Sequence, residues 1–220
     1  MTTDAPSLKP FVLRTFLWLP PCFAAWYVSA PYHTALVGGL ARRLVNLFAP
    51  GTVSALERSG WDLVFVTTLK VYPAPGQAAL LLPEVNPLLY TYGLAFLLAL
   101  MLAERTKMWK ILIGIVVLLP FQVWGIAFDV LVQIGVRLGA DVAAQAGLTG
   151  WRTEAIALGY QLGILIFPSL VPVVVWAAFS RLFGESVLNV QANVQARDAV
   201  FTESKYPPPP HDPAGHRSAQ

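Results

Sequence analysis

The fold follows from Pro120-Phe-Gln-Val-Trp-Gly-Ile-Ala-Phe-Asp-Val-Leu-Val-Gln133, which closes a long apolar run that begins at Ile111. At about 100° per residue in an α-helix, Gln122, Asp129 and Gln133 fall on one stripe roughly 40° wide. A carboxylate and two amides on one line rarely face lipid. We therefore expect this stripe to face a protein interior or a water-filled cleft. The alternative is that the amides bond neighbouring helices while Asp129 lies among the lipid headgroups.

The composition is that of a membrane protein. Hydrophobic residues make up 56% of the 220 residues and charged residues 12%, about half the ~25% charged residues of soluble domains. A net charge of +3 is too small and too scattered to indicate a nucleic-acid partner. The predicted fold class is mainly α, a polytopic membrane protein. Its four transmembrane helices are expected at about residues 11–30, 86–103, 111–131 and 155–179, each near the length that spans about 30 Å of hydrocarbon.

Basic residues predict the orientation of these spans. The loop Glu104–Lys110 holds three Lys or Arg residues, which marks it as cytoplasmic. Four spans then place both termini in the cytoplasm, with residues 1–10 as a lead and residues 185–220 as a tail, disordered at least from residue 202. Arg42 and Arg43 work against this orientation, because they would lie outside.

An external insert is expected at residues 32–85. Apolar and polar residues divide between two faces of Thr34–Ala49, which predicts a separate amphipathic helix, lying flat on the outer membrane surface or packed under the next segment. Apolar residues then alternate with others along Trp61–Val71, with turn residues on both sides. Together with flanking strands at residues 52–58 and 77–82, this predicts a small antiparallel β cap, too small to be stable alone.

Other polar residues fall in the predicted outer half of the bundle. Glu84 and Asn86 lie where the second span begins, and Asn86 before Pro87 also suits an N-cap. Glu154 and Gln161 share a face of the fourth span. If these side chains converge with the stripe, they form one polar cleft under the cap. The predicted binding cleft comprises Glu84, Asn86, Gln122, Asp129, Gln133, Glu154 and Gln161.

The sequence offers no complete catalytic or metal-binding signature, so we predict no catalytic residue, metal or cofactor. Cys22 is the only cysteine and lies in mid-span, which excludes an intramolecular disulfide and a multi-Cys metal site. All three histidines, His33, His211 and His216, lie outside the predicted spans, so a thiol would lack a nearby base. Gly159 and Gly163 are four residues apart, a spacing that predicts close helix packing.

Three segments resemble the motifs of the exosortase H-associated membrane proteins: Glu84-Val-Asn-Pro-Leu-Leu-Tyr90, Pro120-Phe-Gln-Val-Trp-Gly-Ile-Ala-Phe-Asp129 and Glu154-Ala-Ile-Ala-Leu-Gly-Tyr-Gln161. With Trp18-Leu-Pro and Trp26-Tyr27, the resemblance covers nearly all of residues 11–184. It implies a bacterial inner-membrane accessory protein that accompanies an exosortase, a membrane enzyme that processes the C-terminal sorting tails of exported proteins.

The chain is more distantly similar to the exosortase/archaeosortase-like membrane fold itself. Those enzymes present a Cys, an Arg and a His at the outer ends of successive helices. The corresponding regions here are around Asn86, Asp129 and Tyr160, and none matches residue for residue. No catalytic role carries over, and a shared fold would make this chain an inactive relative.

Together these features predict a non-enzymatic accessory protein of an exosortase-type sorting system. It would contact membrane lipids and bind the exosortase or its substrate tail through the outer polar cleft and the β cap. One alternative is a membrane enzyme that uses Asp129 and Glu154 for acid–base chemistry on a lipid or peptide. Another is a small transport subunit, which is disfavoured because the polar residues stop near mid-membrane.

Overall fold

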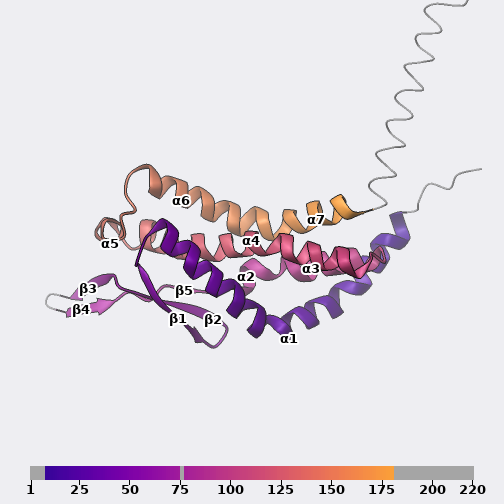
Figure 1. The fold of residues 1–220 in the computed structure, drawn as a ribbon, viewed down its shortest axis with the longest axis horizontal. Coiled ribbons are helices and arrows are strands. Elements are labelled where there is room, and N and C mark those ends of the chain that lie inside the picture. Colours follow the sequence, from indigo (N-terminus) through magenta and orange to yellow (C-terminus); the bar gives the residue numbers. More distant parts are fainter. Residues whose placement is uncertain (1–7, 75–76, 181–220) are drawn as a thin grey trace, which may run out of the picture. The chain divides into compact units, whose positions relative to one another are not determined.

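A computed structural model of the chain describes residues 8–74 and 77–180. These residues are mainly helical, with a small antiparallel β region beside the helices (Figure 1). The chain divides into two units, residues 1–180 and 181–220, and all described residues belong to the first. The predicted cytoplasmic tail and most of the predicted lead lie outside the described residues.

Within residues 8–74 and 77–180, three helical segments are long and apolar enough to cross a membrane: Lys9–Phe48, Met108–Arg137 and Trp151–Phe179. A shorter apolar segment, Leu88–Ala103, occupies the place of the second predicted span. At 1.5 Å per residue it is about 24 Å long, less than the ~30 Å of the hydrocarbon core. The structure therefore contains three candidate spans and one shorter apolar helix.

The β region separates α1 from α2, and from α2 onward the helices follow one another with short breaks. Residues 88–179 contain two π-helical turns, η1 and η2, each continuing an α-helix. The described helices are α1 Leu8–Phe48, α2 Leu88–Thr91, α3 Gly93–Ala103, α4 Met108–Val132, η1 Gln133–Arg137, α5 Ala140–Gln145, α6 Trp151–Gln161, η2 Leu162–Ile166 and α7 Phe167–Phe179.

Helix α1 corrects the sequence prediction, because one continuous helix of 41 residues replaces the first span and the separate amphipathic helix. Pro20, Pro21 and Pro31 all lie inside it, and Figure 1 shows it bent along its length. An internal proline removes one helical hydrogen bond and kinks the helix. The prediction of a separate helix at Thr34–Ala49 was wrong, since the prolines bend this helix without ending it.

The second half of α1 buries only part of the apolar face that its sequence predicted. Val37, Ala41 and Val45 are fully buried, whereas Leu36 and Leu47 are 56% and 75% exposed. Gly38 lies close to β2, since a Cβ there would lie only 2.6 Å from Leu63 Cδ1. One apolar edge of α1 therefore stays uncovered by the described chain.

The β cap, residues 53–85, forms two small antiparallel sheets instead of one. The first has the strand order β1 (Val53–Ser59), β2 (Asp62–Thr67), β5 (Glu84–Val85), and the second pairs β3 (Lys70–Ala74) with β4 (Gln77–Leu80). The predicted strand Trp61–Val71 is thus interrupted after Thr67. The Thr67 hydroxyl donates to the Leu81 carbonyl at 2.7 Å and accepts from the Leu69 amide at 3.3 Å. These local bonds compete with regular pairing and divide the strand.

Helix α4 lies at the centre of the helical packing, since α1, α3, α6 and α7 all contact it. Glycines allow the closest approach between α4 and the last helical segment. A Cβ on Gly163 would lie 2.9 Å from Gly125 Cα, and a Cβ on Gly159 would lie 2.2 Å from Phe128 Cδ1. The close packing predicted for the glycine pair is therefore confirmed.

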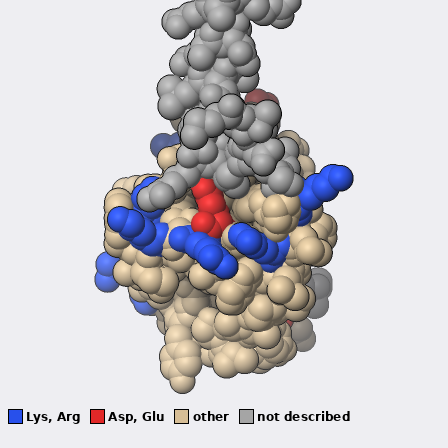
Figure 2. All heavy atoms as spheres, turned by 90° about the vertical axis from the view of Figure 1, so that its right-hand side faces the viewer, with Lys and Arg blue, Asp and Glu red and all other residues tan. Residues whose placement is uncertain are grey.

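The two ends of the helices differ in character. The α3–α4 loop and the start of α1 lie at one end, and the β cap lies toward the other (Figure 1). Figure 2 faces the first of these ends and shows basic side chains around acidic ones. Within the loop, Glu104 accepts hydrogen bonds from Trp176 Nε1 at 2.9 Å and Ser180 Oγ at 3.0 Å. The predicted cytoplasmic loop is thus tied to the end of α7.

Candidate functional site

Asp129 on α4 is the centre of a polar network. It is only 9% exposed. Tyr90 donates a hydrogen bond of 2.9 Å to Oδ2, and Gln133 Nε2 donates one of 3.4 Å to Oδ1. The Arg137 guanidinium lies 3.9 Å from Oδ1. Both oxygens of this carboxylate are therefore engaged by neighbouring side chains.

Local structure explains why these groups meet. Asp129 and Gln133 are four residues apart and share one helix face, as the sequence predicted. The π-helical turn η1 then carries Arg137 to the same side of the helix. Tyr90 reaches Asp129 over Gly125, where a Cβ would lie 2.4 Å from the Tyr90 ring. The absence of a side chain at this position makes room for the ring.

Asn86 positions Tyr90 indirectly. Its Oδ1 accepts a hydrogen bond of 3.0 Å from the Leu88 amide, in the first turn of α2. This is the capping role that the sequence offered for Asn86. The side chain itself is exposed and contributes to the network through the helix that it caps.

The network also reaches the β cap. Gln133 Nε2 donates a second hydrogen bond, of 3.0 Å, to the backbone carbonyl of Glu84 in β5. The Glu84 side chain is exposed, so this residue takes part through its backbone instead of its carboxylate. One amide group therefore connects the buried carboxylate to the strand that leads from the cap into the helices.

Arg137 extends the network to the last helical segment. Its Nη2 donates to the Tyr160 hydroxyl at 3.1 Å, and its guanidinium carbon lies 5.1 Å from the centre of the Tyr160 ring. The Arg137 side chain is 52% exposed, which limits the strength of its ion pair with Asp129. The cation faces the outside while the carboxylate is buried.

Gln122 forms a separate polar contact. Its side chain is 4% exposed, and its Oε1 lies 2.8 Å from Nε2 of His33 on α1. The sequence placed His33 outside the spans, but the structure puts it within the candidate span Lys9–Phe48. Helix α1 continues through Pro31 and its candidate segment is about 60 Å long, twice the ~30 Å hydrocarbon core, so a position of His33 outside the core stays a prediction. The Gln122 Nε2 has no hydrogen-bond partner in the described part of the chain.

Glu154 and Gln161 are both exposed on α6. No hydrogen bond among the described residues joins either side chain to the Asp129 network. The structure thus brings together Asp129, Gln133 and the Glu84 backbone, with Asn86 beside them. It leaves Gln122, Glu154 and Gln161 elsewhere.

Sequence reasoning missed Tyr90 and Tyr160 as members of the network, and His33 as the partner of Gln122. Tyrosine near the end of a span also suits the aromatic belt, so neither tyrosine was distinguishable from a lipid-anchoring residue. Arg137 lies eight residues after Asp129, about two helical turns further on. This exceeds the three- or four-residue spacing of ion pairs within a helix, so the spacing alone does not predict the contact.

The donor set does not suit a metal centre. No group of three His, Cys, Asp or Glu residues that could hold an ion occurs within residues 8–74 and 77–180. Asp129 accepts hydrogen bonds from the Tyr90 hydroxyl and the Gln133 amide, and the Arg137 guanidinium lies 3.9 Å away as an ion-pair partner. This arrangement orients a buried carboxylate between helices and cap.

The fold and the network define a helical membrane protein whose small β cap is hydrogen-bonded to its central helix. A family model for the exosortase H-associated membrane proteins matches residues 5–183, and the chain belongs to this family. The resemblance seen in the sequence motifs is thereby confirmed. No curated protein and no solved structure gives a significant match to the chain.

Proposed function

We propose that this protein is a non-enzymatic accessory subunit of an exosortase-type sorting system, which binds the exosortase or its substrate tail through the β cap and the polar cleft beside it. Membership of the exosortase H-associated family supports the link to the exosortase. The observation that carries the binding role is the double contact of Gln133, which donates to Asp129 and to the Glu84 carbonyl. It holds the cap in a fixed position on α4.

The proposed topology has four spans in a bacterial inner membrane. Helices α2 and α3 together form the second span along the chain, in addition to the three longer candidate spans. Packing of α3 against α1, α4 and α7 supports this, because a short apolar helix enclosed by longer ones need not reach both surfaces alone. The three basic residues of the α3–α4 loop favour a cytoplasmic position for it. Both termini are then cytoplasmic and the cap is external, in a membrane domain of residues 11–184 with the insert 32–85.

An accessory role fits the Asp129 network better than acid–base catalysis does. A general base needs a lone pair directed at the substrate, whereas the Asp129 oxygens accept hydrogen bonds from Tyr90 and Gln133. Glu154, the other carboxylate of the catalytic alternative, is exposed on α6. We therefore expect Asp129→Asn and Glu154→Gln to leave the chemistry of tail processing intact.

The test is co-purification from cells that contain the exosortase, in a mild detergent, with this chain as the tagged bait. The variant Gln133→Ala/Gln145→Ala removes two cap contacts, to Glu84 and to Lys70. The matched control is Gln161→Ala, which removes an exposed amide on α6. We expect the wild type and the control to retain the exosortase or a tail-bearing substrate. The double variant should recover at least about tenfold less of this partner, which corresponds to a loss of ~1.4 kcal/mol in binding free energy.

Two results would overturn the proposal. One is the absence of both the exosortase and its substrates from the wild-type eluate. The other is equal recovery with the double variant, which would mean that the position of the cap does not matter for binding.

A further inference from the structure

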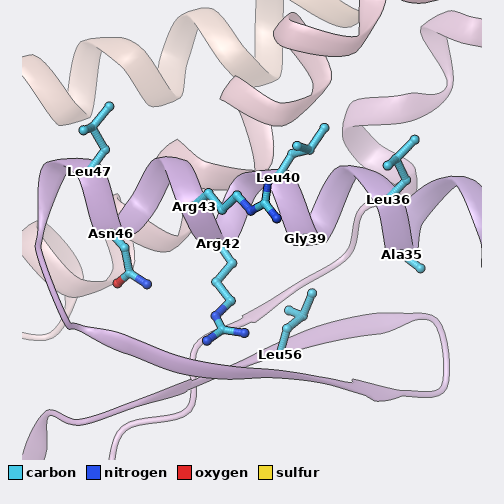
Figure 3. Close-up of a pocket in the computed structure, with 9 residues that line it drawn as sticks. All are labelled: Ala35, Leu36, Gly39, Leu40, Arg42, Arg43, Asn46, Leu47 and Leu56. Carbon is cyan, nitrogen blue, oxygen red and sulfur yellow. The ribbon is translucent and has the colours of Figure 1, made fainter.

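The exposed edge of α1 borders a large hollow beside the cap. The hollow has a volume of about 890 Å³ and lies between the second half of α1 and Leu56 of β1. Its lining combines leucines with two arginines and contains no carboxylate (Figure 3). The lining residues are Ala35, Leu36, Gly39, Leu40, Arg42, Arg43, Asn46, Leu47 and Leu56. The hollow is thus cationic and apolar at once.

The two arginines are held differently. The Arg42 guanidinium donates to the Ser54 carbonyl, and Figure 3 shows it extending from α1 toward β1. Arg43 is exposed and makes no hydrogen bond or ion pair with any described residue. In Figure 3 it runs along the helix toward Leu40. One cation is therefore fixed by the cap, and the other is available to a ligand.

The frame around these arginines is well fixed. Asn46 donates to the Val53 carbonyl and accepts from the Val53 amide, both at 2.9 Å. This pair of bonds closes the turn between α1 and β1. A ligand that binds here meets an existing site and need not order the turn first, which lowers the entropic cost of binding.

A second hollow, apolar except for Arg152, adjoins the first. It has a volume of about 510 Å³ and lies between the end of α1, α4 and α6. Leu47 lines both hollows. Aromatic rings line the second hollow. The Trp124 and Phe128 rings stack with centroids 4.2 Å apart, and the Phe48 ring meets Phe128 edge to face at 5.4 Å. Leu158, 62% exposed, lies on the α6 side.

We propose that the two hollows form one binding site for an anionic phospholipid. The phosphate would lie at Arg42 and Arg43, and an acyl chain would follow Leu47 into the aromatic groove. Arg43 and Leu47 are four residues apart and share a helix face, so the cationic and apolar parts are in register. A phospholipid carries both matching groups in one molecule. This lipid site is independent of the accessory role.

Charge complementarity favours this occupant over an acidic protein segment. Guanidinium groups bind phosphate oxygens through strong, directed hydrogen bonds. The adjoining groove offers apolar and aromatic surface that suits a hydrocarbon chain. A bound lipid would also explain why Arg42 and Arg43 lie on the external side in the proposed topology, where the positive-inside rule disfavours basic residues. Their charge is used locally, by a bound lipid headgroup.

The test is native mass spectrometry of the full chain released from nanodiscs that contain phosphatidylcholine and phosphatidylglycerol. We expect the wild type to retain phosphatidylglycerol several-fold over phosphatidylcholine. The variant Arg42→Gln/Arg43→Gln should lose this preference, and Arg43→Gln alone should reduce it without removing any bond of the fold. The control Arg14→Gln/Arg105→Gln makes the same change in net charge at exposed positions at the other end and should keep it.

A competition experiment shows whether the site recognises an intact lipid or only a free phosphate group. Glycerol phosphate without acyl chains should not displace phosphatidylglycerol, because the groove then remains empty. The proposal fails if the wild type shows no preference between the lipids, if Arg43→Gln changes nothing, or if glycerol phosphate or an acidic peptide displaces the lipid.

Discussion

Tyr90 donates a hydrogen bond of 2.9 Å to Asp129, although 39 residues separate them in the sequence. Tyr90 is 2% exposed and Asp129 9%, so both groups are largely shielded from solvent and lipid. The bond fixes α2 on α4 at the point where the chain passes from β5 into the helices. Its loss would leave a buried carboxylate with fewer donors, which gives the first prediction.

Tyr90→Phe should lower the free energy of unfolding by about 1–3 kcal/mol, because a buried acceptor loses its partner. The measurement is an SDS titration of the protein in mixed micelles. Tyr92→Phe is the matched control, since that tyrosine is half-buried and its hydroxyl bonds to no described residue. Equal losses in both variants would contradict the importance of the bond.

Gly163→Ala should destabilise the protein by about 1–3 kcal/mol, because the added Cβ would require backbone movement. That Cβ would lie 2.9 Å from Gly125 Cα, a contact with backbone that a side-chain rotation cannot relieve. Gly39→Ala serves as the control, since no atom lies within 4 Å of its added Cβ. Alanine has the higher helix propensity, so this control should be neutral or stabilising by up to about 1 kcal/mol. Both variants can be compared by thermal unfolding in detergent.

The His33–Gln122 contact should show positive coupling in a double-mutant cycle. Interhelical polar contacts in membranes contribute about 0.6 to 1.7 kcal/mol, and we expect His33→Ala and Gln122→Ala to couple within that range. The same cycle with His33→Ala and Gln161→Ala should be additive, because Gln161 is exposed on α6. Additivity in the first cycle would show that the 2.8 Å contact contributes nothing to stability.

Two glutamines should protect different parts of the cap from hydrogen exchange. Gln145 accepts from the Lys70 amide and donates to the Lys70 carbonyl, both at 3.1 Å. Gln145→Ala should therefore speed exchange in β3 and β4, and Gln133→Ala should do so in β5. Exchange rates report such local opening directly. Each variant is the control for the other, and identical exchange patterns would contradict separate attachments.

Composition and periodicity predicted the helices and the β region, because burial in lipid and strand alternation both leave strong sequence patterns. They failed at Pro31, which is typical of a helix boundary but here lies inside α1. That error also separated His33 from the helix that carries the first predicted span. A proline can bend a helix or end it, and only the packing around it decides which.

Only part of the candidate site could be predicted, because helical spacing shows which residues share a face but not what that face contacts. Helical spacing showed that Asp129 and Gln133 share a face, and also that Glu154 and Gln161 do. It could not show which way either face points. The structure directs the first pair to Tyr90 and the cap, whereas the second pair is exposed. Convergence between helices is a tertiary property that one helix does not encode.

The attachments of the cap have an evolutionary consequence. Gln133, Gln145, Asn46 and Arg42 all bind backbone atoms of the cap, at Glu84, Lys70, Val53 and Ser54. Every residue type supplies a backbone carbonyl, and every one except proline supplies a backbone amide. The outward side chains of the cap can therefore be exchanged, proline apart, without loss of these bonds. Mutation can therefore diversify the outward surface of the cap while the scaffold below stays unchanged. Homologues with different partners could be made by grafting cap surfaces onto one membrane domain.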